Sequence, residues 1–363
     1  MLAQDRRNRL IKAMGEAGIE ALVVYGNSWQ ADYLRYVADF SMLEGHGMAV
    51  IAPDGSVELF LDSIAEAERA EAETTGVKIS LAPDIVRAVS GRLDRIANHR
   101  IAAAPLSFMP KFIADSARSY KLEDGTKLVD KYLMVKLPSE IDALRRAAKL
   151  ADEGYAIFRK AAVAGRMQYE LIADIETFFR REGCPDNFMI IGSGGKDVFS
   201  MAPPSERRVV AGDMVTTELT PAVQGYFAQI CRTMVLGKAT PAQKKAHAVY
   251  REAMEAGIAV VKPGITAADI ARAENDVFRK YGLGDYVTNK YTRVRGHGLG
   301  LFTDTKPHIL EDVDTVIEAG MVMVVHPNTY HPEVGYMVLG DTIAVTETGS
   351  EVLTRTPREL FEV

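Results

Sequence analysis

Apolar and polar positions along the first part of the chain alternate between helical and strand-like spacing. Leu10, Ile11 and Met14 recur at helical spacing within residues 5–18. The continuous apolar run at 21–26 is typical of a buried strand. Because this alternation continues over about 130 residues, it predicts an α/β domain.

The rest of this region follows the same pattern. A hairpin is predicted to turn at Pro53, Asp54 and Gly55, because these residue types favour tight turns. The elements expected after it are a helix at 63–74, a strand at 77–81, a helix at 83–98 and a short strand at 100–105.

A domain boundary is expected where this alternation ends. Pro138 and Ser139, followed by Asp142, indicate the start of a helix with Ser139 as its N-cap. We therefore predict an N-terminal domain at residues 1–132 and a C-terminal domain at residues 133–363.

The second domain contains an internal repeat. Residues 165–183 align without gaps to residues 264–282, and each copy begins and ends with glycine. Each copy is predicted to be an amphipathic helix that a C-terminal glycine terminates. Helix pairs followed by strands predict a pseudo-symmetric domain with its site between the halves, although two unrelated amphipathic helices would also align.

Composition narrows the class of protein. The 363 residues are 47% hydrophobic and 25% charged, with a net charge of −6, so neither nucleic acid nor a membrane is expected as a partner. We find no apolar run of about 20 residues and no signal-peptide pattern. Cys184 and Cys231 are expected to be buried free thiols, which suits the cytoplasm.

Five segments of the second domain carry a family resemblance. They are GDMVTTEL at 212–219, AQICRTMVLG at 228–237, RGHGLG at 295–300, GMVMVVHPNTY at 320–330 and GDTIAVT at 340–346. With KLPSEIDALRRAA at 136–148 and IGSGG at 191–195, they resemble the creatinase, prolidase, aminopeptidase P and methionine aminopeptidase family.

The resemblance covers the whole chain and implies its architecture. It implies an α/β (α+β) fold in which a creatinase-like α/β domain precedes a C-terminal pita-bread domain with a curved antiparallel sheet. It also implies a homodimer, in which residues 29–36 of the N-terminal domain would lie near the partner subunit's site. Packing in the core of the N-terminal domain would explain the aromatic residues of this segment equally well.

The resemblance also places the metal ligands. Metal-dependent members hold two divalent ions with two aspartates, one histidine and two glutamates, and a further histidine assists catalysis. The five ligand positions correspond to Glu218, Gln229, His297, His326 and Gly340, and the additional histidine to Asp304. Creatinase works without metal, but its catalytic histidine corresponds to Met201 here.

These replacements suggest metal-free chemistry. Two adjacent cations need bridging carboxylates, whereas Gln229 is neutral and Gly340 has no side chain, so a dinuclear centre is not expected. Glu218, His297 and His326 suit proton transfer near neutral pH. The leading hypothesis is a creatinase-like hydrolase or lyase that cleaves a C–N or similar bond of a small polar metabolite without a cofactor.

Two alternatives remain open. The same glutamate and two histidines could hold a single zinc, iron or manganese ion in an amide or dipeptide hydrolase of the Xaa-Pro peptidase type. Alternatively, the histidines are ordinary hydrogen-bonded residues. The protein would then be a non-enzymatic relative that binds a ligand in the cavity that corresponds to the family's metal site.

Candidate substrate contacts surround these three residues. They are Gln229, Tyr226, Arg295, Asp304, Tyr330, His331 and Tyr336. Arg295 could clamp a carboxylate with two hydrogen bonds, and the tyrosines would supply walls. Because strand side chains alternate between two faces, about half of them should point away from the cavity.

Overall fold

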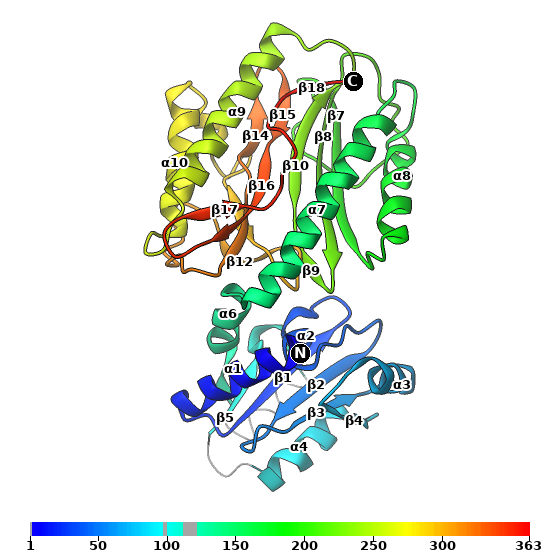
Figure 1. Ribbon diagram of the computed structural model, residues 1–363, viewed down its shortest axis with the longest axis vertical. Coiled ribbons are helices and arrows are strands. Elements are labelled where there is room, and N and C mark those ends of the chain that lie inside the picture. Colours follow the sequence, from blue (N-terminus) through cyan, green and yellow to red (C-terminus); the bar gives the residue numbers. More distant parts are fainter. Residues whose placement is uncertain (1, 97–99, 112–121) are drawn as a thin grey trace. The chain divides into compact units, whose positions relative to one another are not determined.

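The chain forms two compact units, each described by itself here. The computed structural model describes residues 2–96, 100–111 and 122–363, and it divides into Met1–Leu133 and Met134–Val363 (Figure 1). Within the described ranges, no helix is long and apolar enough to cross a bilayer.

The first unit contains a mixed six-stranded sheet. Its strands are β1 (Ala21–Asn27), β2 (His46–Ile51), β3 (Val57–Leu61), β4 (Lys78–Leu81), β5 (Ile101–Ala104) and β6 (Glu123–Asp124). The spatial order is β4-β3-β2-β1-β5-β6, in which β1, β2 and β3 pair antiparallel and the outer pairs are parallel. The predicted hairpin is therefore the β2–β3 pair.

The first unit also contains helices. They are α1 (Leu2–Ala17), α2 (Asp32–Ala38), α3 (Ile64–Glu73), α4 (Ile85–Ile96), the 3-10 turn η1 (Leu106–Phe108) and α6 (Thr126–Met134). The apolar face of α4 packs on the sheet through Val89 and Leu93. The helix predicted at 83–98 is α4, and residues 97 and 98 lie outside the described residues. The sequence pattern did not predict α2.

The second unit is built on a larger antiparallel sheet. Its main path contains β7 (Asn187–Gly194), β8 (Met214–Val223), β10 (Ile230–Val235), β11 (Gly296–Gly298), β12 (Thr305–His308), β13 (Val322–Val325) and β16 (Gly340–Val345). The order is β12-β11-β13-β16-β10-β8-β7. Short strands extend it: β9 (Tyr226–Phe227), β17 (Ser350–Val352) and β18 (Phe361–Glu362), while β14 (Asn328–His331) and β15 (Gly335–Val338) form a separate hairpin.

Two helix pairs flank these strands. They are α7 (Pro138–Ala161) with α8 (Gln168–Arg181), and α9 (Pro241–Val260) with α10 (Ala267–Lys280), which the 3-10 turn η2 (Gly284–Tyr286) follows. The first pair lies against β7 and β8, and α9 lies against β13 and β15 (Figure 1). The mixed α/β fold with a curved antiparallel sheet in its second domain is confirmed.

The internal repeat appears as two matching helices. α8 and α10 each contain 14 residues. The glycines before them, Gly165 and Gly264, have φ angles of 93° and 92°, and those after them, Gly183 and Gly282, have φ angles of 76° and 74°. Side chains strongly disfavour these left-handed angles, so glycine is required at the same places in both copies.

The start of α7 differs from the prediction. Leu137 is the N-cap, Pro138 occupies the first turn, and the Glu140 carboxylate accepts a hydrogen bond from the Leu137 amide at 2.7 Å. Ser139 as N-cap was wrong because Pro138 has a φ angle suited to the first helical position and no N–H to satisfy.

A buried ion pair connects the two central strands. Arg232 of β10 contacts Asp341 of β16 at 2.7 Å, and both side chains are almost fully buried. The Arg232 guanidinium also donates to the carbonyls of Gly340 and Thr356 at 2.7 and 2.6 Å. Arg358 approaches the second Asp341 oxygen at 2.7 Å. These contacts satisfy the charges and fix β10 against β16.

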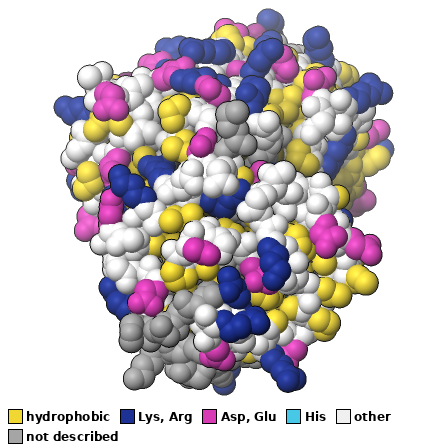
Figure 2. All heavy atoms as spheres, turned by 60° about the horizontal axis from the view of Figure 1, so that its bottom comes forward, with side chains coloured by type: hydrophobic (Ala, Val, Ile, Leu, Met, Phe, Trp, Pro, Cys, Tyr) yellow, Lys and Arg dark blue, Asp and Glu magenta, His cyan; other side chains and the backbone are white. Residues whose placement is uncertain are grey.

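The surface carries mixed charge. On the face drawn in Figure 2, the described basic and acidic side chains are interspersed rather than gathered into patches of one sign. This distribution agrees with the modest net charge of −6. That nucleic acid is not a partner stays a prediction.

The buried ion pair leads to a stability prediction. Arg232→Met should lower the free energy of unfolding by about 3–5 kcal/mol, because it leaves Asp341 buried with fewer partners. The control is Arg355→Met, whose side chain is 72% exposed in a 4.0 Å ion pair and which should change stability by less than about 0.5 kcal/mol. Urea unfolding followed by circular dichroism measures both; equal losses would show that the buried pair is not a special constraint.

Candidate active site

A cavity of about 400 Å³ in the second unit collects most of the predicted site residues. Its lining residues are Phe188, Ile190, Phe199, Ser200, Met201, Glu218, Gln229, Tyr291, Thr292, Val294, His297, Thr303, Asp304, His326, Asn328 and Tyr336. The three predicted catalytic residues are all present, together with three of the seven predicted substrate contacts. Their roles stay predictions.

Strand register explains why distant residues meet in this cavity. Cys231 of β10 lies opposite Glu218 of β8 on one side and opposite Gly340 of β16 on the other. Directly paired residues face the same side of a sheet, and Gln229, two residues before Cys231, shares that side. Three neighbouring strands therefore present these four positions on one face.

Two neutral histidines lie beside these four strand positions. The rings of His297 and His326 are 5.3 Å apart between centroids and lie nearly perpendicular. His297 Nδ1 contacts the Gly298 carbonyl at 3.0 Å, so Nδ1 carries the proton and Nε2 keeps its lone pair. Burial lowers the pKa of His297, and it lowers the pKa of His326 to about 3. Both nitrogens of His326 are buried without a hydrogen-bond partner among the described residues.

Glu218 is the buried carboxyl of the site. Burial, reinforced by the nearby charge of Asp304, raises the pKa of Glu218 to about 7, although a hydrogen bond with Cys231 opposes this. The Gln229 amide donates to Cys231 Sγ at 3.2 Å. Cys231 and Cys184 are both buried free thiols, as predicted.

Asp304 lies nearer the cavity opening, on the segment between β11 and β12. Its Oδ1 contacts His308 Nε2 at 3.0 Å and lies 3.7 Å from His297 Nδ1. Burial opposes ionisation, but the hydrogen bond from His308 and the nearby imidazoles lower the pKa of Asp304 overall. The same hydrogen bond raises the pKa of His308. Asp304 is therefore an anionic group beside the two neutral histidines.

Gly340 and His326 are sterically linked. A Cβ atom at Gly340 would lie 2.5 Å from the Cβ of His326 and 3.1 Å from the Cys231 sulfur. The first distance is shorter than two carbon atoms tolerate, and the second is tighter than an ordinary contact between carbon and sulfur. With His326 and Cys231 in these positions, a side chain at residue 340 requires the surrounding atoms to move.

Four predicted substrate contacts do not line the cavity. Arg295 is fully buried, and its guanidinium donates to the carbonyls of Thr292 and Asn328, both at 2.9 Å, as well as to Asn275. The Tyr226 hydroxyl is buried and donates to Glu140. Arg295 therefore holds the surrounding loops in place, and its guanidinium is not presented to a ligand.

The other two predicted substrate contacts outside the cavity, Tyr330 and His331, belong to the β14–β15 hairpin. The Tyr330 hydroxyl donates to the Lys196 carbonyl at 2.9 Å, and its ring lies between the rings of Phe199 and Tyr291. His331 Nδ1 accepts a hydrogen bond from the Glu333 amide at 3.2 Å. Both residues thus support the hairpin and its aromatic neighbours.

Sequence reasoning missed several wall residues. Phe188, Phe199, Tyr291 and Asn328 line the cavity but were not predicted to do so. Phe188 and Phe199 expose 46% and 59% of their surface. An exposed phenylalanine is recognisable only once the fold is known, so no local motif signalled these positions.

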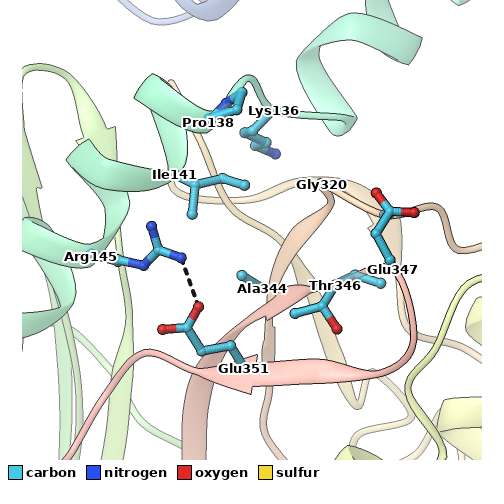
Figure 3. Close-up of a pocket in the computed structure, with 11 residues that line it drawn as sticks. Lys136, Pro138, Ile141, Arg145, Gly320, Ala344, Thr346, Glu347 and Glu351 are labelled. Atoms are coloured by element: carbon cyan, nitrogen blue, oxygen red, sulfur yellow. Dashed lines mark hydrogen bonds and ion pairs between the residues drawn. The ribbon is translucent and has the colours of Figure 1, made fainter.

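A second cavity, of about 390 Å³, lies where α7 begins. Lys136 and Arg145 line it, and the Arg145 guanidinium contacts Glu351 at 2.8 Å (Figure 3). Burial lowers the pKa of Lys136 to about 8. None of the predicted site residues lies here, so the first cavity is the candidate active site.

The donor groups of the first cavity include one carboxylate and two imidazoles. Gln229 is neutral, and its amide donates a hydrogen bond to the Cys231 sulfur. Gly340 has no side chain, so neither residue supplies a carboxylate that could bridge two ions. Glu218, His297 and His326 are the one-carboxylate, two-imidazole set that zinc or ferrous iron accepts. Within the described ranges, no three acidic, histidine or cysteine side chains are gathered at ligand distance.

Comparison with known proteins identifies the family. Residues 6–135 match the creatinase/prolidase N-terminal domain, and residues 142–347 match metallopeptidase family M24. A curated Xaa-Pro dipeptidase from Pyrococcus furiosus is 30% identical over 230 residues, which are 63% of this chain and 65% of that protein. The matched region thus spans slightly less than two thirds of that relative.

Other relatives match over the full length. The uncharacterized peptidase YqhT of Bacillus subtilis is 25% identical over 359 residues, covering 97% of this chain and 98% of that protein. The solved structure of an Xaa-Pro dipeptidase from Bacillus anthracis has a TM-score of 0.84 and 26% identity, covering 99% of this chain and 100% of that one.

Two expectations from the sequence are therefore wrong. A metal-independent, creatinase-like reaction and the absence of a cofactor were inferred from lost ligands, but the matching family is one of metallopeptidases and the relatives are Xaa-Pro dipeptidases. The peptidase alternative agrees better with these relatives. The predicted resemblance, and with it the relation to hydrolases of the Xaa-Pro peptidase superfamily, is confirmed. The chain belongs to metallopeptidase family M24.

Proposed function

We propose that this protein is a metal-dependent hydrolase that cleaves an amide bond of a dipeptide or another short peptide. The observation that carries the proposal is the meeting of Glu218, His297 and His326 in one cavity of about 400 Å³. All three are buried, and His326 has no protein partner for either nitrogen among the described residues. Buried polar groups without partners are costly unless a ligand satisfies them.

These three residues would hold one ion. His297 offers Nε2, because its Nδ1 proton is directed to the Gly298 carbonyl. His326 is neutral near pH 7 because burial lowers its pKa to about 3, so its lone pair is available. Glu218 supplies the negative charge. A bound ion supplies Lewis acidity and lowers the pKa of a coordinated water.

Other lining residues would orient the substrate. The pKa of the Tyr336 hydroxyl is raised well above its usual value by burial, so it remains an O–H donor near neutral pH. Tyr336 and Asn328 lie together on the cavity wall and offer neutral hydrogen-bonding groups to a peptide unit. Ile190 and Val294 contribute apolar wall that limits the access of water.

The homodimer and the cytoplasmic location stay predictions. Trp29 exposes 86% of its surface within the segment 29–36 that the resemblance places near a partner subunit. A large exposed aromatic residue is typical of contact surfaces, which supports an assembly through the N-terminal unit.

The first prediction concerns metal content. Protein supplied with zinc or manganese should retain about one equivalent per chain, and His326→Ala should retain less than about a tenth of that, because a ligand is lost. His331→Ala is the matched control, since His331 does not line the cavity, and should keep the full equivalent. Elemental analysis after gel filtration measures all three proteins. Two equivalents in the parent, or full retention in His326→Ala, would contradict the single-ion assignment.

The second prediction concerns activity. The metal-loaded protein should release proline from alanyl-proline, and a chelator should abolish the release until the ion is restored. Glu218→Gln should reduce kcat/KM by more than about 100-fold, because the anionic donor is lost. Glu333→Gln, outside the cavity, serves as the control. If release continued unchanged in excess chelator, hydrolysis would not depend on metal.

A further inference from the structure

The second cavity, where α7 begins, contains a buried charge without a protein partner. Lys136 exposes 5% of its surface, and its Nζ has no hydrogen-bond partner among the described residues. The side chain lines the cavity of about 390 Å³ and points toward the space between Ile141 and Gly320 (Figure 3). A buried ammonium is costly unless it is paired, so a ligand with a negative charge would satisfy it.

The fold holds Lys136 in this place. Its backbone amide donates to the Gly320 carbonyl at 2.9 Å. Glu140 is the carboxylate whose charge acts on Lys136, but its two oxygens already accept hydrogen bonds from the Leu137 amide at 2.7 Å and the Tyr226 hydroxyl at 2.5 Å. Both Glu140 oxygens are thus engaged by other groups of the fold, and the Lys136 ammonium keeps its capacity for a ligand.

The other charged residues of this cavity lie nearer the surface. The Arg145 guanidinium is shared between Glu351 at 2.8 Å and Asp142 at 2.7 Å, so its charge is already balanced. Glu347 is exposed, in the turn between β16 and β17, and borders the same cavity (Figure 3). The cavity therefore presents an ammonium on its inner wall and a carboxylate, that of Glu347, toward solvent.

This distribution of charge favours one class of ligand. A phosphate or another dianion would gain the Lys136 ammonium, but it would also be repelled by the two lining carboxylates. A zwitterion carries the negative group that Lys136 lacks together with a positive group that Glu347 attracts. An uncharged molecule with both groups is therefore the better match.

The size and the walls of the cavity limit the ligand further. A volume of about 390 Å³ lies within the range of pockets that hold small organic molecules. Pro138, Ile141, Ala344 and Val345 supply apolar wall. The first turn of α7 borders the cavity, and the N-terminus of a helix favours a carboxylate. These features match a small amino acid better than a bare inorganic ion.

We propose that this cavity binds a free α-amino acid with a small apolar side chain, with its carboxylate on Lys136 and its ammonium toward Glu347. The lining residues of this cavity are different from those of the candidate active site, so the inference goes beyond the proposed function and does not depend on it. Free amino acids are what peptide hydrolysis releases, so the ligand class of this cavity is the product class of the proposed reaction.

Three matched compounds and a plain anion test the proposal on the whole, metal-free chain. They are L-valine, L-valinamide, which lacks the carboxylate, N-acetyl-L-valine, which lacks the ammonium, and inorganic phosphate. Calorimetry should show saturable binding of valine at millimolar concentration. Valinamide should bind at least about tenfold more weakly, and N-acetylvaline about twofold to fivefold more weakly. No saturable binding of valine, or tighter binding of phosphate than of valine, would overturn the proposal.

Two variants locate the binding. Lys136→Met removes the charge without removing a printed hydrogen bond of the side chain, and should weaken valine binding by at least about tenfold. Glu347→Gln, at an exposed position, should weaken valine binding by about twofold to fivefold and leave N-acetylvaline binding unchanged. The matched control is Lys149→Met on the same helix, whose side chain is 78% exposed and which should bind valine like the parent.

Unchanged valine binding in Lys136→Met would contradict the proposal. Should that variant fail to fold, Glu347→Gln decides alone, and valine binding equal to that of the parent would sink the idea. His326→Ala alters the other cavity and should bind valine like the parent. If His326→Ala lost valine binding while Lys136→Met kept it, valine would occupy the candidate active site and the inference would fail.

Discussion

The buried ion pair between Arg232 and Asp341 is the constraint on which the site depends. It joins β10 and β16 on one side of the sheet, while the alternate residues Cys231 and Gly340 share the other side with Glu218, which lines the cavity. A shift of one residue in this register would exchange the two faces. The ion pair would then enter the cavity and the site positions would leave it.

At the floor of the cavity, residues 326 and 340 lie close enough that their side chains would compete for the same space. His326 occupies space that a side chain at Gly340 would need, since a Cβ there would lie 2.5 Å from the His326 Cβ. With His326 in this position, a side chain at residue 340 would therefore compete with it for the same space. The cavity keeps a donor at one of two positions that both correspond to family ligands, and the proposal of a single ion rests on this difference.

Much of the fold was predictable because its signals are local. The glycines around α8 and α10 mark both ends of the repeated helix, and the apolar runs locate β1, β4, β5 and the β2–β3 hairpin of the first unit. The start of α7 was misplaced by two residues because Pro138 shifts the cap to Leu137. Glu218, His297 and His326 could be aligned through their flanking motifs, and the structure brings them into one cavity.

The remaining features depend on long-range packing. Arg295 was expected to face a substrate, yet its guanidinium is held by Asn275 and nearby carbonyls, which the sequence around residue 295 does not reveal. Phe188 and Phe199 become wall residues only when β7 and the segment after it meet the β14–β15 hairpin. The reaction class was misjudged for a different reason: absent ligands were taken as absent metal chemistry, whereas the matching family is one of metallopeptidases and the relatives are Xaa-Pro dipeptidases.

The most direct test of the account is anomalous X-ray diffraction from crystals grown with zinc or manganese. The account predicts one anomalous peak per chain, at about 2.0–2.3 Å from a Glu218 oxygen, His297 Nε2 and a His326 nitrogen. Two peaks about 3.5–4 Å apart would contradict the single-ion site. A peak elsewhere in the chain, with none in this cavity, would contradict the assignment of these three residues.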